Sequence, residues 1–159
     1  MIYKRNKTNI GFNIYSLNFK FVNDNYLEFT DTFKPDPKNT IKINVPCNGI
    51  GKHGLRIKVM NGTTSQCEIP INSDTGVATY DKTKCKISQA KKLAKLLSGF
   101  SKLNLKLLNE YFGYRDQSGN IIHGDPSVEK DLKDAIKNFN KLSISEKKNI
   151  EIEGEVKTV

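Results

Sequence analysis

The sequence lacks most of the residue types on which familiar active sites depend. Its 159 residues include no tryptophan, two histidines, three cysteines and three arginines. No two cysteines have the C-x-x-C spacing of zinc and redox motifs, and only His53 and His123 are present to complete a metal site. We therefore expect no metal and no cofactor, and we do not assign catalysis to the chain.

Long apolar runs are missing as well. No stretch approaches the roughly 18 apolar residues that a membrane span requires. No apolar segment follows the basic residues near position 5, as one would in a secretory signal. We expect a cytoplasmic protein without membrane contact, in which Cys47, Cys67 and Cys85 are reduced thiols.

Positive charge is present in excess, and lysine supplies nearly all of it. The chain has 26 basic and 17 acidic side chains, for a net charge of +9. Lysine accounts for 23 of the basic residues, and Lys, Asn and Ile together make up 56 residues. An AT-rich genome produces this bias whatever the function. The scarcity of arginine argues against base-specific reading, because arginine fits phosphate and guanine edges better than lysine does.

The charge is distributed unevenly along the chain. Residues 34–106 contain 14 basic and 4 acidic side chains, whereas residues 114–159 contain 8 and 9. Codon bias alone would spread lysine evenly, so the excess before residue 114 indicates a local basic surface.

Alternating apolar residues predict an antiparallel β-meander in the first half of the chain. The clearest strands cover residues 41–45, 55–59 and 67–71. Pro70 favours an edge position for the last of these strands. A change of phase within residues 10–21 indicates a β-bulge.

Helical periodicity follows over residues 87–112, where Gly99 leaves open whether there is one helix or two. We expect a small hairpin around Ser118-Gly119, a helix that starts at Asp125-Pro126, and a short final strand within 150–156. The predicted fold is α+β: one domain over 1–159, with a meander in 1–82 packed by two or three helices from 86–159.

A stripe of lysines is the first candidate site. If residues 84–112 form one helix, five lysines fall within roughly 60° of arc. These are Lys84, Lys91, Lys95, Lys102 and Lys106. Such a rod of charge could follow a phosphate backbone. The alternative is the ordinary solvent face of an amphipathic helix.

The polar face of the meander is the second candidate site. Lys42, Arg56 and Lys58 lie on it, and Lys52 lies in the adjoining glycine-rich loop 49–54. That loop leads into a strand rather than a helix, which excludes a P-loop. The nearby phenylalanines belong to the apolar alternation, so we do not expect base stacking on this face.

A third hypothesis is that the chain is an enzyme. His53 and Arg56 have the spacing of a base and a phosphate clamp, and His123 could approach them, as in a ribonuclease. No carboxylate is placed in the sequence to orient either imidazole.

Residues 53–113 resemble a small bacterial family of unknown function that is found in toxin–antitoxin-like gene pairs. The resemblance rests on the strand that starts at His53-Gly54-Leu55-Arg56, the strand around Cys67-Glu68-Ile69, and the helix that ends Leu108-Asn109-Glu110-Tyr111-Phe112-Gly113. The family has a His-x-His strand and a Trp near the helix end, where this chain has Leu55 and Leu108. The resemblance implies a ββα unit.

These observations favour a non-enzymatic protein that engages nucleic acid or a nucleoprotein complex through a lysine-rich face, an activity typical of phage or mobile-element inhibitors. Two alternatives stay open. One is a module that recognises an acidic protein, as in a toxin–antitoxin pair. The other is the ribonuclease that uses His53 and Arg56.

Overall fold

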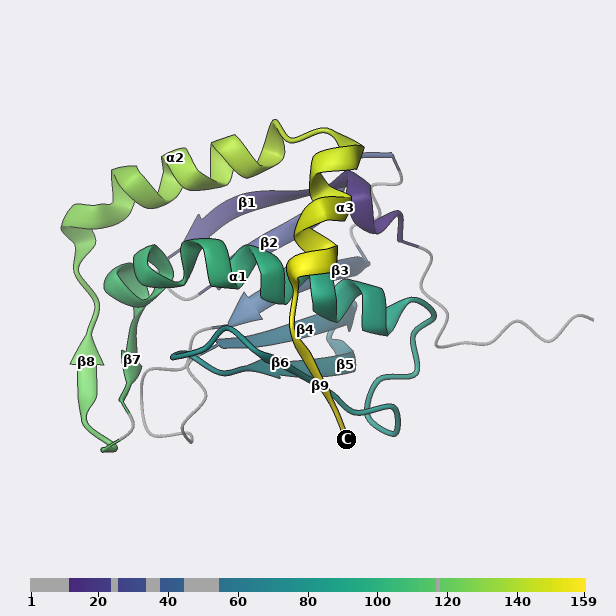
Figure 1. Ribbon diagram of the computed structural model, residues 1–159, viewed down its shortest axis with the longest axis horizontal. Coiled ribbons are helices and arrows are strands. Elements are labelled where there is room, and N and C mark those ends of the chain that lie inside the picture. Colours follow the sequence, from purple (N-terminus) through teal and green to yellow (C-terminus); the bar gives the residue numbers. More distant parts are fainter. Residues whose placement is uncertain (1–11, 24–25, 34–37, 45–54, 117) are drawn as a thin grey trace, which may run out of the picture.

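A computed structural model describes residues 12–23, 26–33, 38–44, 55–116 and 118–159 (Figure 1). The described strands form a seven-stranded sheet and a separate two-stranded hairpin. The sheet contains β1 (Leu17–Asn23), β2 (Tyr26–Asp31), β3 (Asn39–Asn44), β4 (Leu55–Asn61), β5 (Thr64–Ile71), β6 (Ala78–Tyr80) and β9 (Val156–Thr158). The hairpin contains β7 (Gly113–Arg115) and β8 (Ile121–His123).

The strands of the large sheet follow one another in chain order from β1 to β6, and β9 pairs beside β6. All neighbours are antiparallel except β6 and β9, which are parallel. Ile57 sits between Ile43 and Ile69 in adjacent strands, and all three are fully buried. The period-2 alternation therefore puts one apolar face of the sheet into the core.

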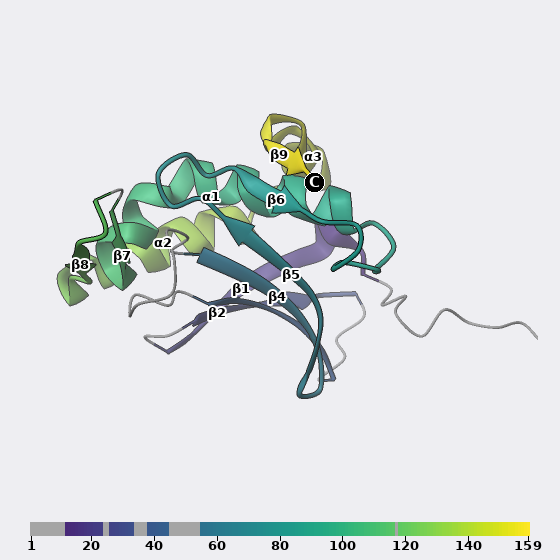
Figure 2. The same cartoon turned by 90° about the horizontal axis from the view of Figure 1, so that it is seen from below.

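The helices are α1 (Ala90–Phe112), α2 (Glu129–Asn140) and α3 (Ile144–Glu153), with short 3-10 turns η1 (Ile14–Ser16) and η2 (Pro126–Val128). All three helices lie on one side of the sheet (Figure 2). Phe100 of α1 packs against Phe19 of β1 and Phe139 of α2, with ring centroids 3.9 and 4.8 Å apart. This sheet-plus-helices arrangement confirms the predicted α+β class.

Helix α1 is a single helix of 23 residues, and Gly99 does not divide it. Gly99 is there for packing: a Cβ at this position would collide with the carbonyl of Ile150 in α3. A Cβ at Gly154, just after α3, would come even closer to the carbonyl of Lys95. The two glycines let the C-terminal segment pack closely onto α1.

Side chains from the helical layer close the β1 edge of the sheet. The Asn140 amide accepts a hydrogen bond from the Phe19 N–H at 2.7 Å and donates one to the Phe19 carbonyl at 2.9 Å. Lys147 is buried, and its ammonium donates to the Leu17 carbonyl at 2.9 Å. Backbone groups that a further strand would need are therefore occupied.

Three local predictions were wrong. The phase change near residue 15 is the 3-10 turn η1, not a bulge. Strand β5 lies inside the sheet, although β6 pairs with it only at Ile71, which leaves Pro70 outside that ladder. Residues 150–153 belong to α3, whose start is fixed by a capping box between Ser143 and Glu146, so the final strand is confined to β9.

Candidate functional site

The face of the sheet that points away from the three helices, here called the open face, carries a row of charged side chains. Cross-strand pairing aligns them in the order Lys20, Glu28, Lys42, Lys58 and Glu68, from β1 to β5. Neighbouring strands lie about 4.8 Å apart, so the row is roughly 19 Å long. No described helix covers it (Figure 2).

Lys42 and Lys58 are directly opposite each other in this row. Like charges at opposed positions destabilise a sheet. Glu28 beside Lys42 and Glu68 beside Lys58 offset part of that repulsion. The structure thus brings two of the predicted residues together in an arrangement that folding alone does not favour.

Arg56 lies on the same face, next to Lys58 along β4. Its guanidinium donates to the carboxylate of Glu68 at 2.8 Å, and its side chain is 29% exposed. The Arg56 Nε is buried and has no hydrogen-bond partner among the described residues. Arg56 also lines a cavity of about 410 Å³ at the β6 end of the open face, together with Glu68, Pro70, Thr79, Asp81, Lys84 and Val159.

Lys84 is not part of the predicted helical stripe, because α1 begins only at Ala90. It lies instead in the connection between β6 and α1, where its ammonium is 3.9 Å from the Asp81 carboxylate and its side chain is 76% exposed. The side chain and backbone N–H of Thr83 donate to Asp81 and, with the nearby Lys84, lower the pKa of that carboxyl. This connection brings Lys84 to the same cavity as Arg56.

The expectation of reduced cysteines is wrong for two of the three. Cys67 of β5 and Cys85 of the β6–α1 connection form a disulfide. Both residues are only 2% exposed, and Cys67 belongs to the apolar alternation of β5. The bond holds the connection that carries Lys84 against the sheet. Cys47 lies outside the described residues.

The other four lysines of the stripe do lie on α1, but on the opposite side of the sheet from the open face. Lys102 pairs with Glu155 at 2.6 Å, and Lys106 is 3.9 Å from Glu110. Lys95 is partly buried and lies where Gly154 crosses α1. Lys91 is exposed.

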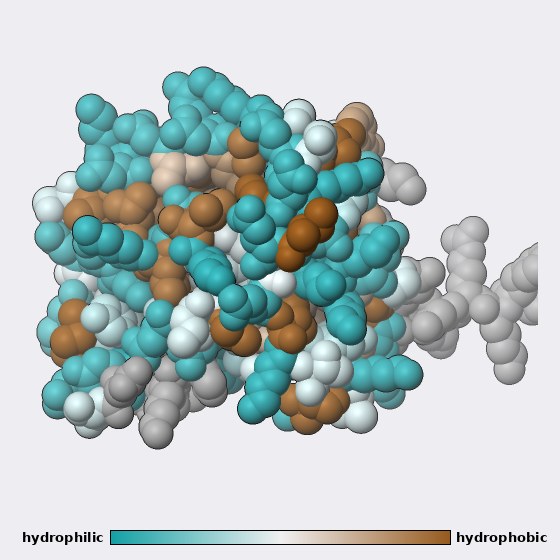
Figure 3. All heavy atoms as spheres, viewed as in Figure 1, coloured by the Kyte–Doolittle hydropathy of each residue, from teal (hydrophilic) through white to brown (hydrophobic). Residues whose placement is uncertain are grey.

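Apolar patches interrupt the hydrophilic surface on this helical side (Figure 3). Leu103 of α1 and Ile152 of α3 are 62% and 79% exposed. The single basic face that we expected from the meander and the first long helix is therefore two surfaces, and the one on α1 is no continuous rod of charge.

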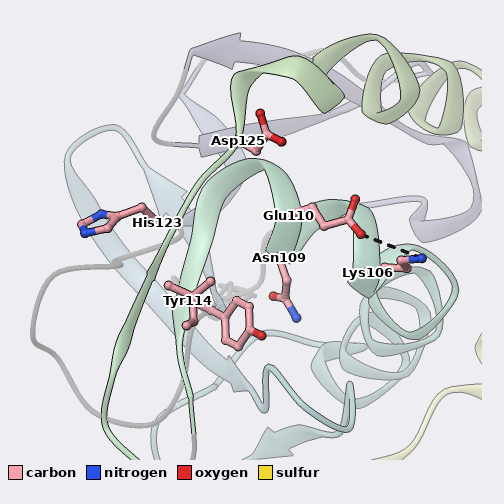
Figure 4. A pocket seen from close by; sticks show the side chains of 7 residues that line it. Lys106, Asn109, Glu110, Tyr114, His123 and Asp125 are labelled. Carbon is pink, nitrogen blue, oxygen red and sulfur yellow. Dashed lines mark ion pairs between the residues drawn. The ribbon is translucent and has the colours of Figure 1, made fainter.

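The ribonuclease hypothesis finds no support in the positions of the described residues. Lys52 and His53 lie outside them. His123 lies on β8 beside a second cavity, of about 380 Å³, that is lined by Lys106, Asn109, Glu110, Tyr114, Ile122, His123 and Asp125. Its imidazole points away from the labelled side chains there (Figure 4). Asp125 accepts from the Ser127 N–H instead of orienting a histidine.

Two further lysines belong to the open face and were missed from the sequence. Lys20 completes the row on β1. Lys157 lies opposite Thr79 through the parallel pairing of β9 with β6. The alternation of β1 could have identified Lys20, whereas nothing in the sequence pairs residue 157 with residue 79.

No protein-family model matches the chain, and comparisons with curated proteins and with solved structures gave no significant match. The resemblance over residues 53–113 stays a prediction. In the part of the chain that the structure describes, no helix has the length and apolarity needed to cross a bilayer. The same residues contain no cluster of three potential metal ligands.

Proposed function

We propose that the protein binds nucleic acid, without base specificity, through the open face of its sheet. The observation that supports this most is the opposed pair Lys42 and Lys58 on a face that no described helix covers. Lys20, Arg56 and Lys157 extend the same surface on both sides.

The chemistry of the face favours phosphate over base contacts. The described side chains that alternate outward are charged or polar, with Met60 and Pro70 as apolar members and no aromatic ring among those of β3, β4 and β5. Sequence-tolerant stacking on aromatic rings is therefore not available there. Lysine ammonium groups act as point charges towards phosphate, which suits binding that tracks the backbone.

Salt dependence tests the proposal. The full chain is titrated against a fluorescently labelled single-stranded oligonucleotide at 20 and 200 mM salt. Three lysine–phosphate contacts predict about a 100-fold loss of affinity over this range, because each contact adds roughly −0.7 to the slope of log K against log salt. No binding at 20 mM salt would overturn the proposal.

A matched pair of variants separates the open face from net charge. Lys42→Gln with Lys58→Gln should reduce the salt slope by about 1.4, for two lost contacts. Lys137→Gln with Lys141→Gln removes the same charge from exposed positions at the end of α2 and should leave the slope unchanged. An equal loss in both variants would mean that only net charge matters. Displacement of the oligonucleotide by poly-glutamate at equal charge would favour an acidic protein partner instead.

A further inference from the structure

The disulfide between Cys67 and Cys85 joins β5 to the connection between β6 and α1, across a separation of 18 residues in the sequence. The turn before Cys85 is stabilised locally: the N–H groups of Lys84 and Cys85 both donate to the Asp81 carbonyl, at 3.0 and 2.9 Å. These bonds shape the turn but do not tie it to the sheet. Ile87 of the same connection is 5% exposed and packs into the core.

The same disulfide lies beside the charged groups of the open face. Cys67 is next to Glu68, whose carboxylate holds Arg56, and the Cys85 sulfur lies 3.7 Å from the Glu68 carbonyl. Lys84, adjacent to Cys85, shares a cavity with Arg56. The exposed Lys82 and Lys86 belong to the same connection. The bond therefore fixes where Lys84 stands relative to the row on the sheet.

We propose that the Cys67–Cys85 disulfide is a redox-sensitive clamp that keeps Lys84 beside the charged groups of the open face. This inference rests on the proposed function. A dithiol reductant would donate two electrons and two protons: the Sγ–Sγ bond breaks, Cys67 and Cys85 become thiols, and the dithiol becomes a disulfide. Because both cysteines are buried, exchange requires local opening of the connection and proceeds slowly.

Reduction should loosen residues 81–89 while the sheet and helices stay folded. A Cys47→Ser background leaves Cys67 and Cys85 as the only cysteines that can be oxidised or reduced. The oxidised and the dithiol-reduced full chains are compared in this background. Amide hydrogen exchange within 81–89 should accelerate at least 10-fold on reduction, with exchange in β4 and α1 unchanged. The affinity for the labelled oligonucleotide should fall about 3- to 5-fold, and the salt slope by about 0.7 for one lost contact.

A variant of Lys84 tests whether the disulfide affects binding through this adjacent lysine. Lys84→Gln in the oxidised protein should lose the same affinity, and reducing this variant should cause little further loss. The proposal is wrong if reduction leaves either the exchange of 81–89 or the affinity unchanged. It is equally wrong if reduction unfolds the whole sheet, because the disulfide is then a structural staple.

The two proposals fail in different ways. If neither redox form binds the oligonucleotide at 20 mM salt, the proposed function is overturned, and the exchange data alone decide whether the clamp exists. If both forms bind equally well, the function stands and the clamp does not.

Discussion

The open face of the sheet and the outer side of α1 carry the same residue type at regular spacing, yet their lysines are used differently. On the sheet, Lys42 and Lys58 stand side by side under no described helix. On α1, Lys95 and Lys102 lie where Gly154 and Glu155 cross the helix. The comparison teaches that a stripe of lysines can mark an intramolecular contact as readily as a binding surface.

The largest effect should come from filling the contact on α1. Gly154→Ala places a Cβ against the Lys95 carbonyl and should lower the free energy of unfolding by about 2–3 kcal/mol. Gly99→Ala should lower the free energy of unfolding by a smaller amount, because the helix propensity of alanine is about 1 kcal/mol more favourable than that of glycine. Denaturant unfolding measures both. The exposed neighbour Glu153→Ala should change stability by less than about 0.5 kcal/mol. A Gly154→Ala protein as stable as the parent would refute the close contact.

A smaller effect should separate the two surfaces in binding. Lys58→Glu should lower oligonucleotide affinity about 10-fold at low salt, which corresponds to about 1.4 kcal/mol. Lys91→Glu makes the same charge change on α1 and should alter affinity by less than about 3-fold. Fluorescence anisotropy at fixed salt compares them. Equal losses would show that the lysines of α1 belong to the binding surface as much as those of the sheet.

The ion pair that crosses from α1 to the C-terminal segment should contribute less still. Lys102 and Glu155 are 49% and 58% exposed, so solvent screens their attraction. Lys102→Ala should cost less than about 1 kcal/mol, and a double-mutant cycle with Glu155→Ala should give a coupling of the same order. Oligonucleotide affinity should not change. A tenfold loss of affinity in Lys102→Ala would show that this lysine serves the ligand.

Lys147 lies on neither the open face nor the outer side of α1. Burial lowers its pKa from 10.5. In the window just below that value the unfolded chain holds the proton more tightly than the folded one, so stability should rise with pH there. Lys147→Met removes this contribution. The slope of unfolding free energy against pH between 8 and 10 should therefore be smaller in the variant. Identical slopes would mean that the ammonium is not buried.

Most of the sheet could be predicted because its strands follow one another in the chain. Alternation alone identified β3, β4 and β5, and the dipeptide Asn61-Gly62 is typical of the tight hairpin turn that joins β4 to β5. Asp31 broke the apolar pattern of β2 for a reason that only the structure supplies. Its buried carboxylate accepts hydrogen bonds from Ser16 and from the N–H groups of Asn13 and Phe33.

Contacts between distant segments could not be predicted in the same way. The parallel pairing of β9 with β6 joins residues almost half the chain apart, and no local pattern records it. The disulfide was missed because the sequence shows no secretory signal, from which we expected reduced thiols. The two glycines on α1 and after α3 were visible in the sequence, but only the crossing of the two segments explains them.

The amide of Asn140 has one more consequence. By bonding to both backbone groups of Phe19, it takes the place that a residue of an eighth strand would occupy. A strand from another molecule would first have to displace α2 to pair there. This side of the sheet is thereby protected against edge-to-edge aggregation, the hazard to which a flat sheet with an unpaired border is exposed in a crowded solution.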